Sequence, residues 1–326
     1  MKKRNFYLMT ALVALSFTVY SGGGEPKSNE PDVYIVGSGK IENKEESLLW
    51  KNGVAYRITD GFATDVFVSG NDVYLAGAGY DGAQVWKNGV MQKLAGGGTP
   101  SSIFVSGNDV YVTGWVYNET YQKHVAVLWK NGVMQKLSNE QYHAGAFSVF
   151  VSGKDVYVTG YERDAATLWK NGVAQYLIGK PGYGEPRATI SQGHSVFVSG
   201  NDVYVAGYEE TVNRSTAKLW KNGVVQNLSG VNSMANAVFV SGNDVYVTGW
   251  EGEDARLWKN GIIQNLRREN RCHNANSVFV SGNDVYVIGS ECENVGGILW
   301  KNGIVQNFSN VANSVAKAIF VKNETK

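Results

Sequence analysis

The motif Trp-Lys-Asn-Gly occurs seven times in this chain of 326 residues. The copies lie 36 to 51 residues apart and begin at Trp50, Trp86, Trp129, Trp169, Trp220, Trp258 and Trp300. Ahead of six copies lies a second motif, of which Val196–Val205 (VFVSGNDVYV) is an example. Self-similarity at such a period indicates stacked supersecondary units, so this repeat constrains the fold of everything after residue 31.

Each repeat unit predicts four short β-strands, which we name A to D. In the unit of Trp220 they are Ser195–Ser199, Asp202–Gly207, Ala217–Lys221 and Val224–Leu228. Gly-Asn joins A to B and Asn-Gly joins C to D, and both pairs are typical of two-residue hairpins, whose central residues need positive φ. Four-stranded units of about forty residues predict a β-propeller.

The two ends of the repeat region predict how the propeller closes. The region begins with a B-type strand, Asp32–Val36, and finishes with an A-type strand, Ala318–Val321. If these two pair, seven complete blades form and no free sheet edge remains between the ends. We therefore predict an all-β fold over 32–326: a seven-bladed β-propeller of four-stranded antiparallel blades, closed by pairing of the C-terminal strand with the N-terminal blade.

The order of motifs also supports a resemblance. Each unit resembles the repeat of WD-repeat propellers in the order of its parts, which are VFVSGND, VYVxG, a loop, LWKNG and xxxL. The Trp-Asp and Gly-His pairs of that family are absent. It is more similar to uncharacterised secreted bacterial proteins with Trp-Lys-Asn-Gly repeats. The resemblance covers roughly residues 32–321 and implies a fold rather than a chemistry, because propellers host many functions.

The first 31 residues are typical of an export segment. Residues 1–21 combine a basic start with an apolar run that is too short to span a membrane, which predicts a signal peptide. Residues 22–31 predict a disordered tether. The segment also resembles a bacterial lipoprotein leader, but Ser21 and Gly22 stand where that leader has its cysteine. We expect a secreted, periplasmic or cell-surface bacterial protein with no membrane span.

Charge and motifs exclude several classes of partner. The chain has 30 Lys and Arg against 29 Asp and Glu, and without Lys2, Lys3 and Arg4 the balance is 27 against 29. No basic stripe remains, so we expect no nucleic-acid partner. The sequence GAGYDG at 77–82 precedes a strand rather than a helix, which excludes a dinucleotide site. The four histidines lack metal-ligand spacing, so we expect no metal. We also expect no cofactor and a monomer.

The two ends of the propeller differ in sequence. At one end every blade carries the same two hairpins, and an Asp–Lys pair such as Asp202 with Lys221 is predicted in each blade. At the other end lie the B–C and D–A connections, which differ from copy to copy. Binding sites concentrate in variable loops on a rigid scaffold, so we expect a binding site at this variable end.

Aromatic and acidic residues follow the glycine that ends strand B in successive blades. The candidate ligand-binding residues are Trp115, Tyr161, Glu162, Tyr208, Glu209, Trp250 and Glu251, together with His194 at the mouth of the expected central channel. Flat rings with polar edges suit sugars and peptide side chains. In the alternative interpretation the rings only cover blade edges and the glutamates are solvated.

Three functions remain open on this sequence. The leading hypothesis is a non-enzymatic binding module that engages a glycan or protein ligand through the variable end. The second is an extracellular polysaccharide hydrolase or lyase with a Glu/His site at the channel mouth, which would need closely placed groups such as His194 with Glu209 or Glu251. The third is a scaffold subunit of a surface complex, for which the uniform end would matter.

The two cysteines predict a disulfide that links loops at the variable end. Counting from a Gly282-Asn283 turn places His273 opposite Cys292, and Cys272 one residue out of register. Loops beyond the strand ends can absorb this offset, so a Cys272–Cys292 disulfide is expected in a secreted protein. Two free thiols are the alternative.

Overall fold

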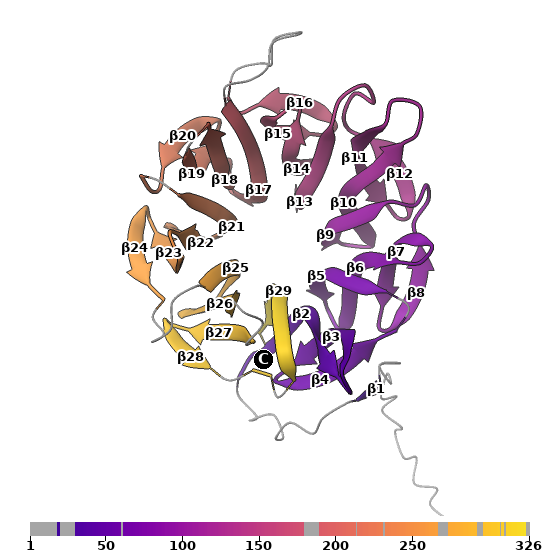
Figure 1. Ribbon diagram of the computed structural model, residues 1–326, viewed down its shortest axis with the longest axis vertical. Helices are drawn as coiled ribbons and strands as arrows, with labels where there is room; N and C mark the ends of the chain where they lie inside the picture. The colour runs from indigo at the N-terminus through magenta and orange to yellow at the C-terminus, as the bar shows by residue number, and fades with distance from the viewer. Residues whose placement is uncertain are drawn as a thin grey trace, which may run out of the picture.

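The computed structural model shows seven four-stranded antiparallel sheets arranged in a ring (Figure 1). It describes residues 18–19, 30–59, 61–178, 189–212, 214–230, 232–266, 273–291, 296–306, 308–309 and 311–323. Most of the predicted signal peptide and tether therefore lies outside the described residues. Within the part that is described, no helix is long and apolar enough to cross a membrane.

Blade 1 joins both ends of the repeat region, and blades 2 to 7 follow in chain order. Blade 1 contains β2 (Asp32–Ile41), β3 (Lys44–Lys51), β4 (Val54–Ile58) and β29 (Ala312–Lys322), with β1 (Thr18–Val19) paired outside β4. Blades 2 to 4 contain β5 (Phe62–Ser69), β6 (Asp72–Gly79), β7 (Gly82–Lys87), β8 (Val90–Lys93); β9 (Thr99–Ser106), β10 (Asp109–Asn118), β11 (Lys123–Lys130), β12 (Val133–Lys136); and β13 (Ala144–Ser152), β14 (Asp155–Glu162), β15 (Ala165–Lys170), β16 (Val173–Tyr176). Blades 5 to 7 contain β17 (Thr189–Ser199), β18 (Asp202–Thr211), β19 (Arg214–Lys221), β20 (Val224–Asn227); β21 (Ser233–Ser241), β22 (Asp244–Glu251), β23 (Asp254–Lys259), β24 (Ile262–Asn265); and β25 (His273–Ser281), β26 (Asp284–Glu291), β27 (Gly297–Lys301), β28 (Ile304–Gln306).

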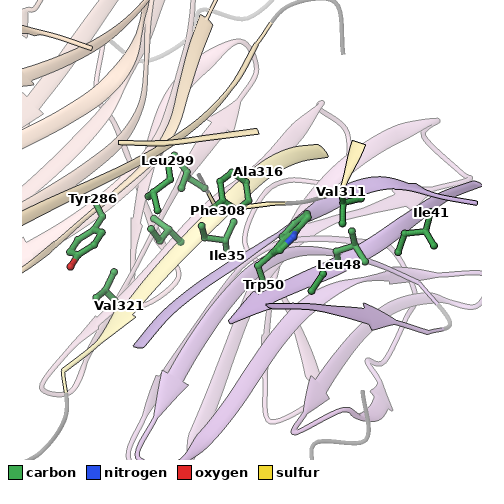
Figure 2. Packing of buried hydrophobic residues seen from close by; sticks show 13 residues of the cluster. Ile35, Ile41, Leu48, Trp50, Tyr286, Leu299, Phe308, Val311, Ala316 and Val321 are labelled. Carbon is green, nitrogen blue, oxygen red and sulfur yellow. The ribbon is translucent and has the colours of Figure 1, made fainter. Parts of the chain in front are cut away.

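The predicted closure of the ring is confirmed. Strand β29 pairs antiparallel with β2, with Ile319 opposite Ile35 and Val321 opposite Val33. Figure 2 shows the apolar cluster at this joint, where Ile35 and Trp50 from the start of the chain pack with Leu299 and Val321 from its end. The first and last strands of the ring therefore share one sheet and one core.

The seven tryptophans of the repeat lie in the core between blades. All seven side chains are at most 2% exposed. Trp220 of blade 5, for example, lies in one apolar cluster with Leu168 and Leu177 of blade 4. Because burying a side chain of this size contributes several kcal/mol, roughly 3–5 by truncation to alanine, these rings are the main anchors that join successive blades.

Every innermost strand carries an extra residue at the same level, a β-bulge that the sequence analysis did not predict, and β29 has a second irregularity between Ala312 and Val315. The bulge residues, which we call the bulge belt, are Thr64, Ser101, Phe147, His194, Asn236, Asn276 and Lys317. Each bulge brings a carbonyl oxygen of the innermost strand to 1.8–2.1 Å from where a Cβ would stand on a glycine of the next strand. These glycines are Gly37, Gly77, Gly114, Gly160, Gly207, Gly249 and Gly289. The repeated glycine is therefore required by close backbone approach.

The bulge changes the register that the sequence predicted for the cysteine pair. His273 pairs with Glu291 and not with Cys292, because Asn276 is the extra residue and shifts every pair beyond it by one position. The predicted pairing of His273 with Cys292 was therefore wrong. Cys272 and Cys292 themselves lie outside the described residues, so their disulfide stays a prediction.

Seven phenylalanines form a closed ring around the axis, which we call the phenylalanine ring. Its members are Phe67, Phe104, Phe150, Phe197, Phe239, Phe279 and Phe320, one from each innermost strand. Every ring contacts both neighbours, with centroids 4.7–5.0 Å apart and planes inclined by 48–57°. All seven remain partly exposed. The sequence shows these residues only as members of a strand, and gives no sign that they meet.

The uniform end repeats one polar cluster in all seven blades. In blade 5 the Lys221 ammonium lies 2.7 Å from the Asp202 carboxylate and 5.3 Å from the centre of the Tyr204 ring. The Asn222 amide donates to Asp202 and its oxygen accepts the Val203 N–H. Lys221 and Asn222, in that order, hold the pKa of Asp202 below its usual value. The predicted Asp–Lys pair is present in every blade, at 2.7–2.9 Å.

Candidate ligand-binding site

Four aromatic side chains of blades 4 and 5 form a cluster at the variable end, which we call the aromatic cluster. Phe147 and His194 belong to the bulge belt, whereas Tyr161 and Tyr208 follow the glycine at the end of strand B. The Phe147 ring lies 5.6 Å from Tyr161 and 5.7 Å from His194, and His194 lies 5.3 Å from Tyr208. The structure therefore brings three predicted site residues together around Phe147, which the sequence analysis did not select.

Small residues make room for these rings. Gly145 pairs with Tyr161 across the sheet, and a Cβ on Gly145 would lie 2.9 Å from the Tyr161 ring and 3.4 Å from the Phe147 ring. In the corresponding position β21 has Met234 and β25 has Asn274. The lack of a side chain at Gly145 thus lets the two rings approach each other in blade 4.

His194 is held as a neutral imidazole. Its Nδ1 lies 3.1 Å from the carbonyl oxygen of Ala235 in the next blade, so the neutral ring donates from Nδ1 and leaves Nε2 as an acceptor. Burial lowers the pKa of His194 to about 4, although the bond to Ala235 opposes this. Burial is likewise the main cause that raises the pKa of Tyr161 and Tyr208. At neutral pH the cluster therefore presents uncharged rings with polar edges.

A second group of rings lies between blades 3 and 4. Trp115 is stacked on His124 with centroids 4.1 Å apart and an interplanar angle of 29°. His124 also meets the edges of Tyr117 and His143, at 5.8 and 5.5 Å, and its backbone N–H donates to Nδ1 of His143. Burial, then the positive charge of Lys123, lowers the pKa of His143. Trp115 is thus stacked on His124, which in turn contacts His143 and Tyr117.

The three predicted glutamates point away from these rings. Glu162 is buried and accepts hydrogen bonds from the Asn139 N–H and the Tyr176 hydroxyl, at 2.8 and 2.9 Å. Successive residues of a strand face opposite sides of the sheet, which is why Tyr161 and Glu162 diverge. The carboxylate joins blade 4 to the D–A connection of blade 3, a contact that the sequence pattern does not reveal.

Glu209 and Glu251 are also engaged with neighbouring side chains. Glu209 lies 2.7 Å from the ammonium of Lys218. Glu251 lies 3.1 Å from Nε of Arg256 and accepts from the Ser229 hydroxyl of blade 5. The contacts of His194 are to Phe147, Tyr208 and Ala235, so the arrangement does not pair it with either glutamate.

Trp250 lies apart from both groups of rings. It is half-buried on β22, where its register partners are Met234 and Ala255. Among the described residues its ring contacts neither the aromatic cluster nor Trp115. No group of three His, Cys, Asp or Glu that could hold a metal ion occurs in the described ranges.

Comparison with known proteins gives the fold and no family. No family model and no curated protein matches the chain. A puromycin-hydrolyzing peptidase of Mycobacterium tuberculosis is 10% identical, with a TM-score of 0.55 over 92% of this chain and 54% of the peptidase. An acylaminoacyl peptidase of Pyrococcus horikoshii is 13% identical, with a TM-score of 0.54 over 90% of this chain and 53% of the enzyme. The computationally designed protein Ika8 is 16% identical, with a TM-score of 0.52 over 89% and 94%.

These likenesses show a propeller fold alone. The chain spans about half the length of the two peptidases, and its identity to all three structures is low. What the molecule does must therefore be argued from its own side chains.

Proposed function

We propose that this protein is a non-enzymatic binding module that engages an extracellular ligand through the rings of blades 3 to 5 at its variable end. The observation that carries the proposal is the gathering of rings there, in the aromatic cluster and around Trp115. Tyr208 is buried, whereas Phe147, Tyr161, His194 and Trp115 are partly exposed. The rings stand on β-strands, so their positions are set before a ligand arrives. Little conformational entropy is then lost on binding.

A glycan suits this surface better than a protein ligand. Tyrosine hydroxyls and neutral histidine nitrogens lie at the edges of flat apolar faces, and sugars likewise combine apolar faces with hydroxyl edges. The nearby glutamates already hold partners, so they position blades rather than present a negative charge. A hydrolase or lyase would need Glu209 or Glu251 to leave its cation, and no observation favours that.

A glycan array followed by titration tests the proposal. We expect Trp115→Ala and Tyr161→Ala to weaken binding of the best glycan at least tenfold, because each removes a ring face. Tyr80→Ala is the matched control, since Tyr80 is fully exposed at the variable end of blade 2, away from both groups. If the folded double variant Trp115→Ala/Trp250→Ala binds as well as the parent, these rings are not the site. A protein captured through the same rings would replace the glycan by a protein ligand.

The cellular location belongs to the same proposal. We place the protein outside the bacterial cytoplasm because of its predicted signal peptide and its resemblance to secreted Trp-Lys-Asn-Gly repeat proteins. The expected form is a monomer, with Cys272 and Cys292 joined. Fractionation with sequencing of the mature N-terminus tests the export, and sedimentation tests the monomer. Two reactive thiols in the native secreted protein would contradict the disulfide.

A further inference from the structure

The phenylalanine ring places a large apolar surface at the centre of the molecule. In the described part of the chain it is the only place where seven aromatic side chains meet. Each ring packs sideways on two neighbours and keeps part of its surface exposed. Because the rings encircle the axis, that exposed apolar surface faces the axis, where contiguous apolar surface usually marks a binding site.

The orientation of the rings fixes the shape of this surface. Neighbouring planes are inclined by 48–57°, close to the about 51° by which successive blades turn in a seven-bladed propeller. This equality is expected when every ring plane stands parallel to the axis. The seven rings therefore form a short apolar sleeve around the axis.

The width of the sleeve limits which ligands can fit inside it. Seven evenly spaced centroids at these separations lie roughly 5.5 Å from the axis, so the nearest ring carbons lie roughly 4 to 5.5 Å from it. A single alkyl chain on the axis would contact such carbons near the van der Waals optimum of about 3.5–4.0 Å. A sugar ring or a two-chain lipid is too wide for this opening.

The bulge belt supplies a charge at the variable side of the sleeve. Thr64, His194, Asn236 and Asn276 each reach a backbone carbonyl of the next blade. Lys317 occupies the same position on β29 but is exposed, and no partner of its ammonium occurs among the described residues. Lys317 is three residues from Phe320 of the sleeve, or on the order of 10 Å along the strand.

We propose that the axis binds one straight-chain carboxylate, with its alkyl tail in the phenylalanine ring and its carboxylate at Lys317. Roughly eight carbons span the distance between them, because each adds ~1.3 Å. Asp65 follows Thr64 of the bulge belt and also carries a negative charge when ionised. Its carboxylate is directed to the next blade, where it accepts the Ile103 N–H at 2.9 Å. The site shares no residue with the rings proposed to bind a glycan, although Phe147 and His194 of the aromatic cluster lie on the same bulge belt as Lys317.

Calorimetric titration of the full-length protein with sodium decanoate tests the proposal. We expect one decanoate per chain, at least tenfold weaker binding of butanoate, and weaker binding of decyltrimethylammonium. Lys317→Gln should weaken decanoate binding about tenfold, whereas Lys44→Gln, an exposed lysine of the same blade, should leave it unchanged. Phe104→Leu should weaken decanoate binding several-fold, and Phe62→Leu, which lies outside the ring and is 54% exposed, should not.

Specific results would overturn this assignment. Butanoate binding as well as decanoate, or equal effects of Lys317→Gln and Lys44→Gln, would exclude the axial site even if Phe104→Leu fails to fold. Retention of the protein by vesicles of phosphatidylglycerol, but no titration with decanoate, would assign the chemistry to a lipid surface instead. Trp115→Ala is expected to leave decanoate binding unchanged, so failure of the glycan proposal and failure of this one are distinguishable.

Discussion

The two ends of the propeller are built on the same strands but use their side chains differently. At the uniform end every blade repeats the same Asp, Lys, Asn and Tyr contacts, with nearly constant distances. At the variable end the blades share the bulge, and Asn236 and Asn276 make the same contact to the next blade, but most of the other side-chain contacts differ from blade to blade. The buried Glu162 joins the Tyr176 hydroxyl and a loop N–H, Glu209 joins a lysine, and Lys317 has an exposed ammonium without a described partner.

This difference separates stability from recognition within one repeat. A contact that recurs in seven blades contributes to stability seven times, and losing one copy leaves six. A residue that departs from the repeat has no such duplicate, so its presence is better explained by a ligand. Glycine shows the same division, because variable-side glycines avoid a backbone clash whereas uniform-end glycines only form turns.

The largest expected effect comes from the glycines next to the bulges. Gly207→Ala places a Cβ 1.9 Å from the carbonyl oxygen of Gln192, so the bulge must be lost. We expect unfolding to be easier by roughly 4 kcal/mol or more in urea titrations. Gly200→Ala, in a uniform-end turn with φ of 58° and no atom within 4 Å, should cost only about 1–2 kcal/mol. Equal costs would contradict the proposed division between glycines.

The uniform-end asparagine should show the next largest effect. Asn222 has a φ of 53°, and its side chain satisfies the Val203 N–H and Asp202. Asn222→Ala should therefore lower the free energy of unfolding by roughly 2 kcal/mol, because it adds backbone strain and removes two hydrogen bonds. Asn222→Gly relieves the strain but not the lost bonds, and should recover about half. An unchanged midpoint in urea for Asn222→Ala would show that the cluster is not structural.

The Asp65 carboxylate, which reaches from blade 2 to blade 3, should make stability depend on pH. Burial raises the pKa of Asp65 from 3.8 to about 6, against hydrogen bonds from Ile103, Ser102 and Val66 that lower it. The folded state thus holds this proton more tightly, so the contribution of Asp65 to stability is full below about pH 4 and is lost as pH rises through about 6. Blade 4 has Ser148 at the position equivalent to Asp65. The variant Asp65→Ser should be more stable than the parent by about 1–2 kcal/mol at pH 7.5.

Denaturation at several pH values checks this expectation. The gain of Asp65→Ser over the parent should shrink between pH 7 and pH 4, and Ser148→Ala should show no such trend. A gain that is constant with pH would mean that Asp65 does not titrate in this range.

The smallest effect is expected at the uniform-end ion pair. Lys221 and Asp202 are both more than a third exposed, at 52% and 38%, so water screens their attraction. A double-mutant cycle with Lys221→Gln and Asp202→Asn should give a coupling close to zero, because an exposed pair gains little from its attraction in water. A clearly measurable coupling would show that the Tyr204 ring strengthens the pair beyond an ordinary surface contact.

Local signals explain why the blades were predictable from the sequence. Gly200-Asn201 and Asn222-Gly223 specify two-residue turns, and the strands beside them follow from their alternating pattern. Ring closure could be predicted because the repeat region has an unpaired B-type strand at its start and an unpaired A-type strand at its end. The bulges were missed because one extra residue leaves no local mark, and this is why His273 was placed opposite the wrong partner.

The candidate site was only partly predictable because it depends on contacts between blades. The sequence placed Tyr161, Tyr208 and His194 at one end, and the structure shows their rings in a common cluster with Phe147. The direction of Glu162 follows from strand alternation, but its partners in a neighbouring loop do not. The phenylalanine ring could not be found without knowing that seven equivalent positions face one axis.

The pairing of β29 with β2 also sets the timing of assembly. A ribosome delivers six blades and three strands of blade 1 before residues 312–323 appear, so the molecule stays an open arc until β29 has been made. During that interval β2 has no inner neighbour, and Phe67 and Phe279 lack Phe320 between them. A chaperone that shields β2 at this stage, or a protease that recognises it, would distinguish closed rings from open arcs by a single strand.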